Sequence, residues 1–176
     1  TAELTKRRIS TNGQRMPLWL PGEAQPFPKT IEDAYSQWLF QGPLFQGIRS
    51  IEGVNAKGII ASLEPSSPNE LLTGALGTSW LVDPVIFDCV LQLPILWGRL
   101  HWDITTLPSS FGCYHHFAPF SEQRIQAQVR VRPETSQLMN TIYTDVAFFD
   151  ANGHLLGLVE NLKHNGSKTL NRLTVK

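Results

Sequence analysis

The chain has 176 residues, of which 41% are hydrophobic and 17% charged, enough apolar material for the core of one compact domain but not of two. Fifteen basic residues balance fifteen acidic ones, so the chain offers no general electrostatic attraction to nucleic acid or to anionic membranes. The two cysteines, Cys89 and Cys113, lack Cys-x-x-Cys spacing, which predicts reduced core thiols and a cytoplasmic location.

No segment predicts a membrane span or a signal peptide, and we expect a soluble protein. The longest apolar stretch, Leu81 to Trp97, contains two aspartates, a glutamine and two prolines. The N-terminus is charged and polar, with no apolar run after its basic residues.

The first thirty residues are rich in proline and glycine, which predicts a linker or extension over residues 1–29 of a domain cut from a longer polypeptide. We expect the folded domain over residues 30–165 and a tail over residues 166–176. A helix should begin after Thr30, whose side chain can cap the first turn, and end at Gly42-Pro43.

Two β-like segments follow, at residues 48–52 and 58–63, and the polar turn between them predicts a hairpin. Residues 65–79 are predicted to form a loop. Asp83-Pro84 is a strong helix opening, because aspartate caps free amides and proline is tolerated at the first helical position. The helix is apolar on nearly every side, which indicates complete burial, and Pro94 is expected to kink or end it.

The C-terminal half predicts strands at residues 110–117, 124–132, 141–150 and 154–163. One buried helix and about six strands, without β-α-β alternation, indicate an α+β fold in which an antiparallel sheet wraps around a central helix. This is the hot-dog arrangement, although the pattern by itself does not separate it from other α+β folds.

Four segments resemble the dehydratase domains of modular polyketide synthases from about Tyr35 to Lys163. The first is Gly42-Pro43-Leu44-Phe45-Gln46-Gly47, which resembles the start of the family's second hot dog, and the second is residues 83–92, which resemble its His-Pro-x-Leu-Leu-Asp-Ala-x-x-Gln helix. The third is Leu107-Pro108-Ser109-Ser110-Phe111, which resembles the family's Leu-Pro loop and the strand after it, and the fourth is the hairpin at residues 149–153. The chain therefore resembles the C-terminal half of a double hot-dog dehydratase. A narrower resemblance is to polyunsaturated fatty acid synthases or related iterative polyketide synthases.

The resemblance implies a dehydratase that converts 3-hydroxyacyl thioesters on an acyl carrier protein to 2-enoyl thioesters. It implies that Asp88 is the general acid and Gln92 its helper. Residues that would contact the substrate are Phe45, Gln46, Pro84, Leu107 and Pro108. The implied partners are the acyl carrier protein and other domains of a synthase; no cofactor is implied beyond the phosphopantetheine arm of the carrier.

The residues around Asp88 are consistent with an acid. Apolar neighbours would raise the pKa of its carboxyl, whereas the nearby helix N-terminus would lower it, and the sequence does not decide between them. Gln92 lies one helical turn further on the same face and can donate to this carboxyl. The alternative for Asp88 is a capping or solvated carboxylate; for Asp83, directly before a proline, capping is the expected role.

The family's catalytic histidine motif, His-x-x-x-Gly-x-x-x-x-Pro, is absent, because none of the five histidines is followed by glycine four positions later. Candidate substitute bases are His101, His115 and His116. The last two would point to opposite faces of a strand and so cannot bind one metal ion, and no metal site is expected.

Three functions stay open from the sequence. The chain is a dehydratase or half of one, with the base supplied by a second hot dog or a homodimer partner. Alternatively it is a catalytically incomplete hot dog that serves as a scaffold for dimerisation or carrier-protein docking. The third is a product-template-like cyclase that uses the same aspartate.

Overall fold

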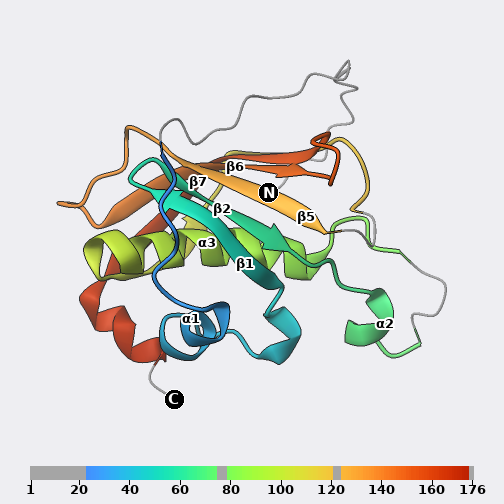
Figure 1. Ribbon diagram of the computed structural model, residues 1–176, viewed down its shortest axis with the longest axis horizontal. Coiled ribbons are helices and arrows are strands. Elements are labelled where there is room, and N and C mark those ends of the chain that lie inside the picture. The colour runs from blue at the N-terminus through green and yellow to red at the C-terminus, as the bar shows by residue number, and fades with distance from the viewer. Residues whose placement is uncertain (1–22, 75–78, 121–123, 175–176) are drawn as a thin grey trace.

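The computed structural model describes residues 23–74, 79–120 and 124–174, and it shows an antiparallel sheet curved around one long helix (Figure 1). Within these residues the strands follow the order β1-β2-β5-β6-β7-β3, and β4 also pairs with β7. The strands are β1 (Ile48–Asn55), β2 (Gly58–Leu63), β3 (Thr105–Ser110), β4 (Cys113–His116), β5 (Ile125–Val131), β6 (Thr141–Phe149) and β7 (Leu155–Ser167). The predicted hot-dog fold is confirmed.

Helix α3 (Pro84–Trp102) is the central helix, and eleven of its nineteen residues are buried. Its start is fixed by Asp83, whose Oδ1 accepts hydrogen bonds from the amides of Val85 at 2.8 Å and Ile86 at 3.2 Å. The same carboxylate accepts from the Ser66 amide at 2.6 Å and the Ser66 hydroxyl at 2.8 Å, which ties the preceding loop to the helix start. The predicted capping role of Asp83 is confirmed.

The helix does not end at Pro94, contrary to one of the two outcomes expected from the sequence. Proline has no amide hydrogen for the carbonyl of Val90, and such an interruption costs about 3 kcal/mol in an exposed helix. Here Pro94 is buried, and Leu93, Ile95 and Leu96 around it are all 1% exposed or less. Burial of these side chains continues the helix for eight residues beyond the proline.

The sheet presents alternate residues to the helix, as the sequence of β5 indicates. Ile125, Ala127 and Val129 are fully buried against α3. On the other face Arg130 is exposed but Gln128 is buried, so the alternation in exposure is incomplete. The strand predicted at residues 110–117 is shorter, and β3 precedes it where a loop around Leu107-Pro108 was expected. Cys113 is exposed, so the expectation of a second core thiol was wrong.

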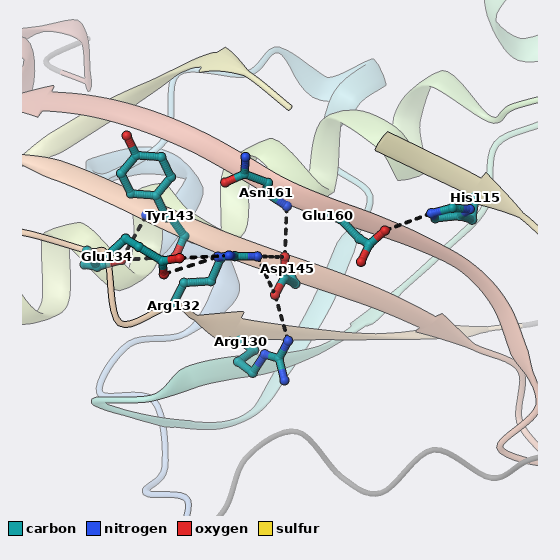
Figure 2. Close-up of polar contacts among 9 residues, drawn as sticks. His115, Arg130, Arg132, Glu134, Tyr143, Asp145, Glu160 and Asn161 are labelled. Atoms are coloured by element: carbon teal, nitrogen blue, oxygen red, sulfur yellow. Dashed lines mark hydrogen bonds and ion pairs between the residues drawn. The ribbon is translucent and has the colours of Figure 1, made fainter. Parts of the chain in front are cut away.

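A bulge between β6 and β7 is held by a buried carboxylate (Figure 2). The register shifts between Thr144 and Val146, and Asn161 opposite has φ 55°. The Asp145 carboxylate accepts from the Asn161 amide, from Arg130 and from Arg132 at 2.8, 2.8 and 3.1 Å. Burial acts to raise the pKa of Asp145, but these donors hold it below its usual value.

The smaller helices are spread along α3, and Asn171 in the last of them donates to the carbonyl oxygen of Asp103 at the C-terminal end of α3. They are α1 (Ile31–Gln37), α2 (Pro68–Leu71) and the 3₁₀ turns η1 (Pro43–Phe45) and η2 (Lys168–Thr174). Thr30 caps α1 as predicted, but α1 ends at Gln37, before Gly42. Most of the predicted linker lies outside the described residues. The boundary expected after residue 165 falls inside β7. No helix among the described residues is long and apolar enough to cross a membrane.

The close pairing of β2 with β5 gives a test of the fold. A Cβ atom on Gly58 would overlap the carbonyl oxygen of Val129, whereas one on Gly42 would meet nothing within 4 Å. We expect Gly58→Ala to lower the free energy of unfolding by about 3 kcal/mol, because the strands must separate to admit the methyl group. Gly42→Ala is the matched control and should stay within about 0.5 kcal/mol of wild type in urea unfolding. Equal stability of the two variants would contradict the strand pairing.

Candidate active site

Asp88 and Gln92 lie one turn apart near the start of α3 and form a hydrogen-bonded pair. Nε2 of Gln92 donates to Oδ2 of Asp88 at 2.8 Å. Gln92 is fully buried, whereas the Asp88 side chain is partly exposed. The expected spacing of one helical turn therefore produces the expected contact.

The buried amide of Gln92 is hydrogen-bonded on both sides. Nε2 also donates to the carbonyl oxygen of Phe45 in η1 at 2.8 Å. Oε1 accepts from the hydroxyl of Tyr35 in α1 at 3.0 Å, and this hydroxyl accepts from the amide of Ile48 in β1 at 3.0 Å. Tyr35 of α1 and Phe45 of η1 thus bond to Gln92 directly, and Ile48 of β1 joins the network through Tyr35.

The pKa of Asp88 is raised above its usual value. Burial is the largest cause, and hydrogen bonds from Gln92 and Gln41 act in the opposite direction without cancelling it. The free amides at the helix start are taken by the Asp83 carboxylate, so they do not reach Asp88. Of the two opposing effects expected from the sequence, burial is the stronger.

The predicted substrate-contacting residues fall into two groups. Phe45 is 37% exposed beside the Asp88–Gln92 pair, Pro84 is the first residue of α3, and Gln46 donates its amide to the carbonyl of Gln41 at 3.1 Å. Leu107 and Pro108 lie in β3, opposite Asn165 and His164 of β7. The first group borders the pair directly.

The second group lies along α3 rather than beside the pair. A Cβ on Gly98 would be 3.3 Å from Thr106, and the ring of Phe111 lies 5.9 Å from that of Phe87. β3 and Phe111 after it therefore run antiparallel to α3, from beside Gly98 to beside Phe87. Leu107 and Pro108 lie between these two points.

An aromatic cluster surrounds the side chain of Phe87, the residue before Asp88. Phe87 contacts both Phe111 and Tyr114, with ring centroids 5.9 and 5.6 Å apart in edge-to-face geometry. Phe111 is 50% exposed, which is unusual for so large an apolar side chain. Sequence reasoning had not assigned Phe87 or Tyr114 to the site.

His101 is not brought near Asp88. Thirteen residues of α3 separate the two, which corresponds to about 20 Å along the helix axis. Its ring packs 4.6 Å from that of Trp97, and burial lowers its pKa.

The other two histidines lie on opposite faces of β4, as the sequence predicted. His115 contacts the Glu160 carboxylate at 2.8 Å (Figure 2). Nδ1 of His116 lies 3.1 Å from the Tyr114 hydroxyl. Tyr114 packs against Phe87, so His116 is the one on the same side of β4 as the aromatic cluster beside Asp88.

Over residues 23–74, 79–120 and 124–174, no group of three or more His, Cys, Asp or Glu side chains is arranged to hold a metal ion. An open hollow of about 820 Å³ is lined by residues that include Lys57, Trp97, Trp102 and Arg132. It lies toward the C-terminal end of α3 and is separate from the Asp88–Gln92 pair.

Tyr35 and Gln41 are polar neighbours of the pair that sequence reasoning missed. The sequence places Tyr35 on a short amphipathic helix, where it appears as an ordinary core aromatic. A buried phenol needs a hydrogen-bond partner, which is the one signal in the sequence that could have pointed to it. The partner itself is 57 residues away.

The sequence and the fold both match polyketide synthase dehydratases. The family model described as the polyketide synthase dehydratase N-terminal domain matches residues 17–166. The motif with Asp88 and Gln92, in contrast, resembles the family's C-terminal half, so the assignment to that half rests on the motif. No curated protein matches the chain.

Three solved structures illustrate the similarity of fold. The dehydratase domain of RzxB from Pseudomonas fluorescens is 17% identical, with a TM-score of 0.61, over 82% of this chain and 54% of that one. GphF dehydratase 1 is 18% identical, with a TM-score of 0.63, over 83% and 52%. The dehydratase domain from the CurJ module of the curacin polyketide synthase is 12% identical, with a TM-score of 0.62, over 88% and 52%. The chain spans about half the length of these structures.

The raised pKa of Asp88 predicts a pH-dependent effect of Asp88→Asn on stability. The folded chain binds this proton more tightly than the unfolded chain, so the free energy of unfolding falls as the pH rises from the unfolded pKa, about 3.9, through the folded pKa. Because Asn carries no charge to desolvate, we expect the variant to be the more stable form at neutral pH and to lose this advantage in acid. Urea unfolding across the pH range measures the difference.

The matched control is Asp103→Asn at the other end of α3. Asp103 is exposed, has φ 51°, which asparagine also tolerates, and pairs with Arg99 at 3.0 Å. This variant should show no gain in stability at neutral pH. A loss of stability in Asp88→Asn at neutral pH would contradict the desolvated carboxyl.

Proposed function

The chain belongs to the polyketide synthase dehydratase family, and from this membership we propose that it removes water from 3-hydroxyacyl thioesters to give 2-enoyl thioesters. The observation that carries the proposal is the Asp88–Gln92 pair: a carboxyl whose pKa is raised by burial and whose Oδ2 is held by a buried amide. A carboxyl with a raised pKa keeps its proton to a higher pH than an ordinary aspartate does, and the departing hydroxyl requires a proton donor.

In the proposed reaction a base removes a proton from C2, and the electrons of that C–H bond form the C2–C3 double bond. The C3–O bond breaks, and the oxygen leaves as water with the proton from Asp88. The carboxylate left behind recovers a proton before the next turnover. Gln92 holds the carboxyl in one orientation both while Asp88 gives up its proton and while it recovers one.

We propose that the base comes from outside this hot dog. The chain has no His-x-x-x-Gly-x-x-x-x-Pro motif, and His101 lies about 20 Å along the helix from Asp88. A second hot dog that carries a catalytic histidine, from another domain of a synthase or from a partner subunit, would complete the site. The exposed apolar side chains of Phe40, Leu44 and Phe45 beside the pair fit such a contact.

The proposed substrate arrives on the phosphopantetheine arm of an acyl carrier protein, and the reaction as written needs no further cofactor. The acyl chain would lie along the apolar surface formed by Phe45 and the aromatic cluster of Phe87, Phe111 and Tyr114. Gln46, Pro84, Leu107 and Pro108 are proposed as further contacts along this path. The parent enzyme is proposed to be a polyunsaturated fatty acid synthase or a related iterative polyketide synthase.

A non-catalytic scaffold is the second candidate function, and the absence of the histidine motif favours it. The polar pair opposes it, because a scaffold gains no stability from a carboxyl whose burial raises its pKa.

The test is hydration of a 2-enoyl carrier-protein thioester, the reverse reaction, by the chain mixed with a hot dog that bears the histidine motif. We expect activity in the mixture that neither protein shows alone. Asp88→Asn should lower it by about 10²–10⁴-fold, the range for loss of a general acid. Asp103→Asn, fifteen residues further along α3, should leave it unchanged.

Each outcome decides a different point. Activity of the chain alone would overturn the external base and direct the search to His116. Activity that survives Asp88→Asn would overturn the acid assignment. A folded chain that is inactive in every mixture would contradict the dehydratase and support the scaffold.

A further inference from the structure

We infer that Tyr35 is a positioning residue, which fixes the direction of the Gln92 amide and thereby leaves Oδ1 of Asp88 as the oxygen that carries the acidic proton. The first part stands on the hydrogen bonds alone. The second part, the use of this proton in dehydration, rests on the proposed function.

The direction of the Tyr35–Gln92 hydrogen bond follows from the Ile48 amide. This amide can only donate, and it lies 3.0 Å from the Tyr35 oxygen, which therefore accepts. The single phenol proton is then free to point at Gln92 Oε1, also at 3.0 Å. Burial raises the pKa of Tyr35, so the phenol keeps this proton at any physiological pH.

The Phe45 carbonyl favours the same orientation of the amide. A carbonyl oxygen can only accept, so the Gln92 atom 2.8 Å from it must be the nitrogen. With Oε1 turned to Tyr35 and Nε2 turned to Phe45 and Asp88, every hydrogen bond of the set joins a donor to an acceptor. The reverse orientation would place Oε1 against the Phe45 carbonyl and Nε2 against the Tyr35 proton.

The orientation of Gln92 determines which Asp88 oxygen is protonated. Nε2 has two hydrogens, one directed to Phe45 and one to Oδ2 of Asp88 at 2.8 Å. An oxygen that accepts this hydrogen bond is a poor place for a proton of its own, so Gln92 directs the proton of the neutral carboxyl to Oδ1, and Gln41 makes a smaller contribution to the same carboxyl. An acid with its proton on a defined oxygen has a defined direction of transfer.

The hydroxyl of Tyr35, rather than its ring alone, is therefore the functional group. Tyr35→Phe keeps the packing of the ring in a site that is only 6% exposed but removes the donor to Oε1. Only the Phe45 carbonyl then orients the Gln92 amide, so the hydrogen bond from Nε2 that stabilises the charged form of Asp88 is held less firmly. We expect the pKa of Asp88 to rise.

The experiment is a carbon-13 NMR titration of the Asp88 carboxyl in the 176-residue chain, which needs neither substrate nor a partner. The expected result is an upward shift in Tyr35→Phe and none in Tyr143→Phe. Tyr143 is the matched control, because its ring lies in β6, 5.7 Å from the ammonium group of Lys163. The other ionisable groups near Tyr35, Cys89 and Arg49, stay the same in all variants.

A second pair of variants asks whether Tyr35 acts through Gln92. In a Gln92→Leu background, Tyr35→Phe should cause no further shift of the Asp88 titration, because the amide that links them is gone. The same shift in both backgrounds would overturn the inference, as would an unchanged titration in Tyr35→Phe alone.

If Tyr35→Phe does not fold, 3-fluorotyrosine at position 35 keeps both ring and hydroxyl. Its more acidic phenol is a stronger donor to Gln92, and we expect the Asp88 pKa to fall; an unchanged titration would overturn the inference. In the mixed hydration assay, Tyr35→Phe should lower kcat about tenfold with KM unchanged. Loss of turnover in all proteins would contradict the proposed function but would leave the titration as an independent result.

Discussion

A sheet closed around one helix keeps most of that helix out of contact with water, and polar side chains on it must then find their hydrogen bonds within the protein. Eleven residues of α3 are buried, and Gln92 is fully enclosed among them. The partners of Gln92 therefore come from α1, η1 and α3 itself, because water cannot supply them, and β1 contributes the amide that bonds to Tyr35. The same enclosure, incomplete at Asp88, raises the pKa of that carboxyl. One packing constraint thus produces both the geometry and the acidity of the candidate site.

The features that the sequence predicts correctly are those that depend on residues close together in the chain. Asp83 before Pro84 predicts a capped helix start, and Asp83 does accept from the first free amides. Alternation in residues 124–132 predicts a strand with one buried face, which is β5. The spacing of Asp88 and Gln92 predicts a contact across one helical turn, and their atoms lie 2.8 Å apart. In each case the relevant interaction spans five residues or fewer, or follows the repeat of a single strand.

The features that it misses depend on segments far apart in the chain. Pro94 does not end α3, because burial against the sheet outweighs the local cost of a proline. Leu107 and Pro108 join β3, because β7, more than fifty residues later, pairs with them. Tyr35 bonds to Gln92 across 57 residues, and nothing in the local pattern of α1 distinguishes its hydroxyl from that of any buried tyrosine. The contact between Asp88 and Gln92 could be predicted from the sequence, but the supporting network of hydrogen bonds from Gln92 to Tyr35 and Phe45 could not.

This supporting network bears on the choice between an enzyme and a scaffold. A scaffold needs the volume at position 92 to be filled, and leucine would fill it without requiring a donor from Tyr35 and an acceptor from Phe45. The chain instead holds a fully buried amide in one orientation with groups from α1 and η1, and that amide also donates to the partly exposed Asp88. The burial of Asp88 costs stability, and Gln92 offsets only part of that cost. An arrangement that orients a destabilising carboxyl, rather than removing it, is typical of a site at which that carboxyl is used.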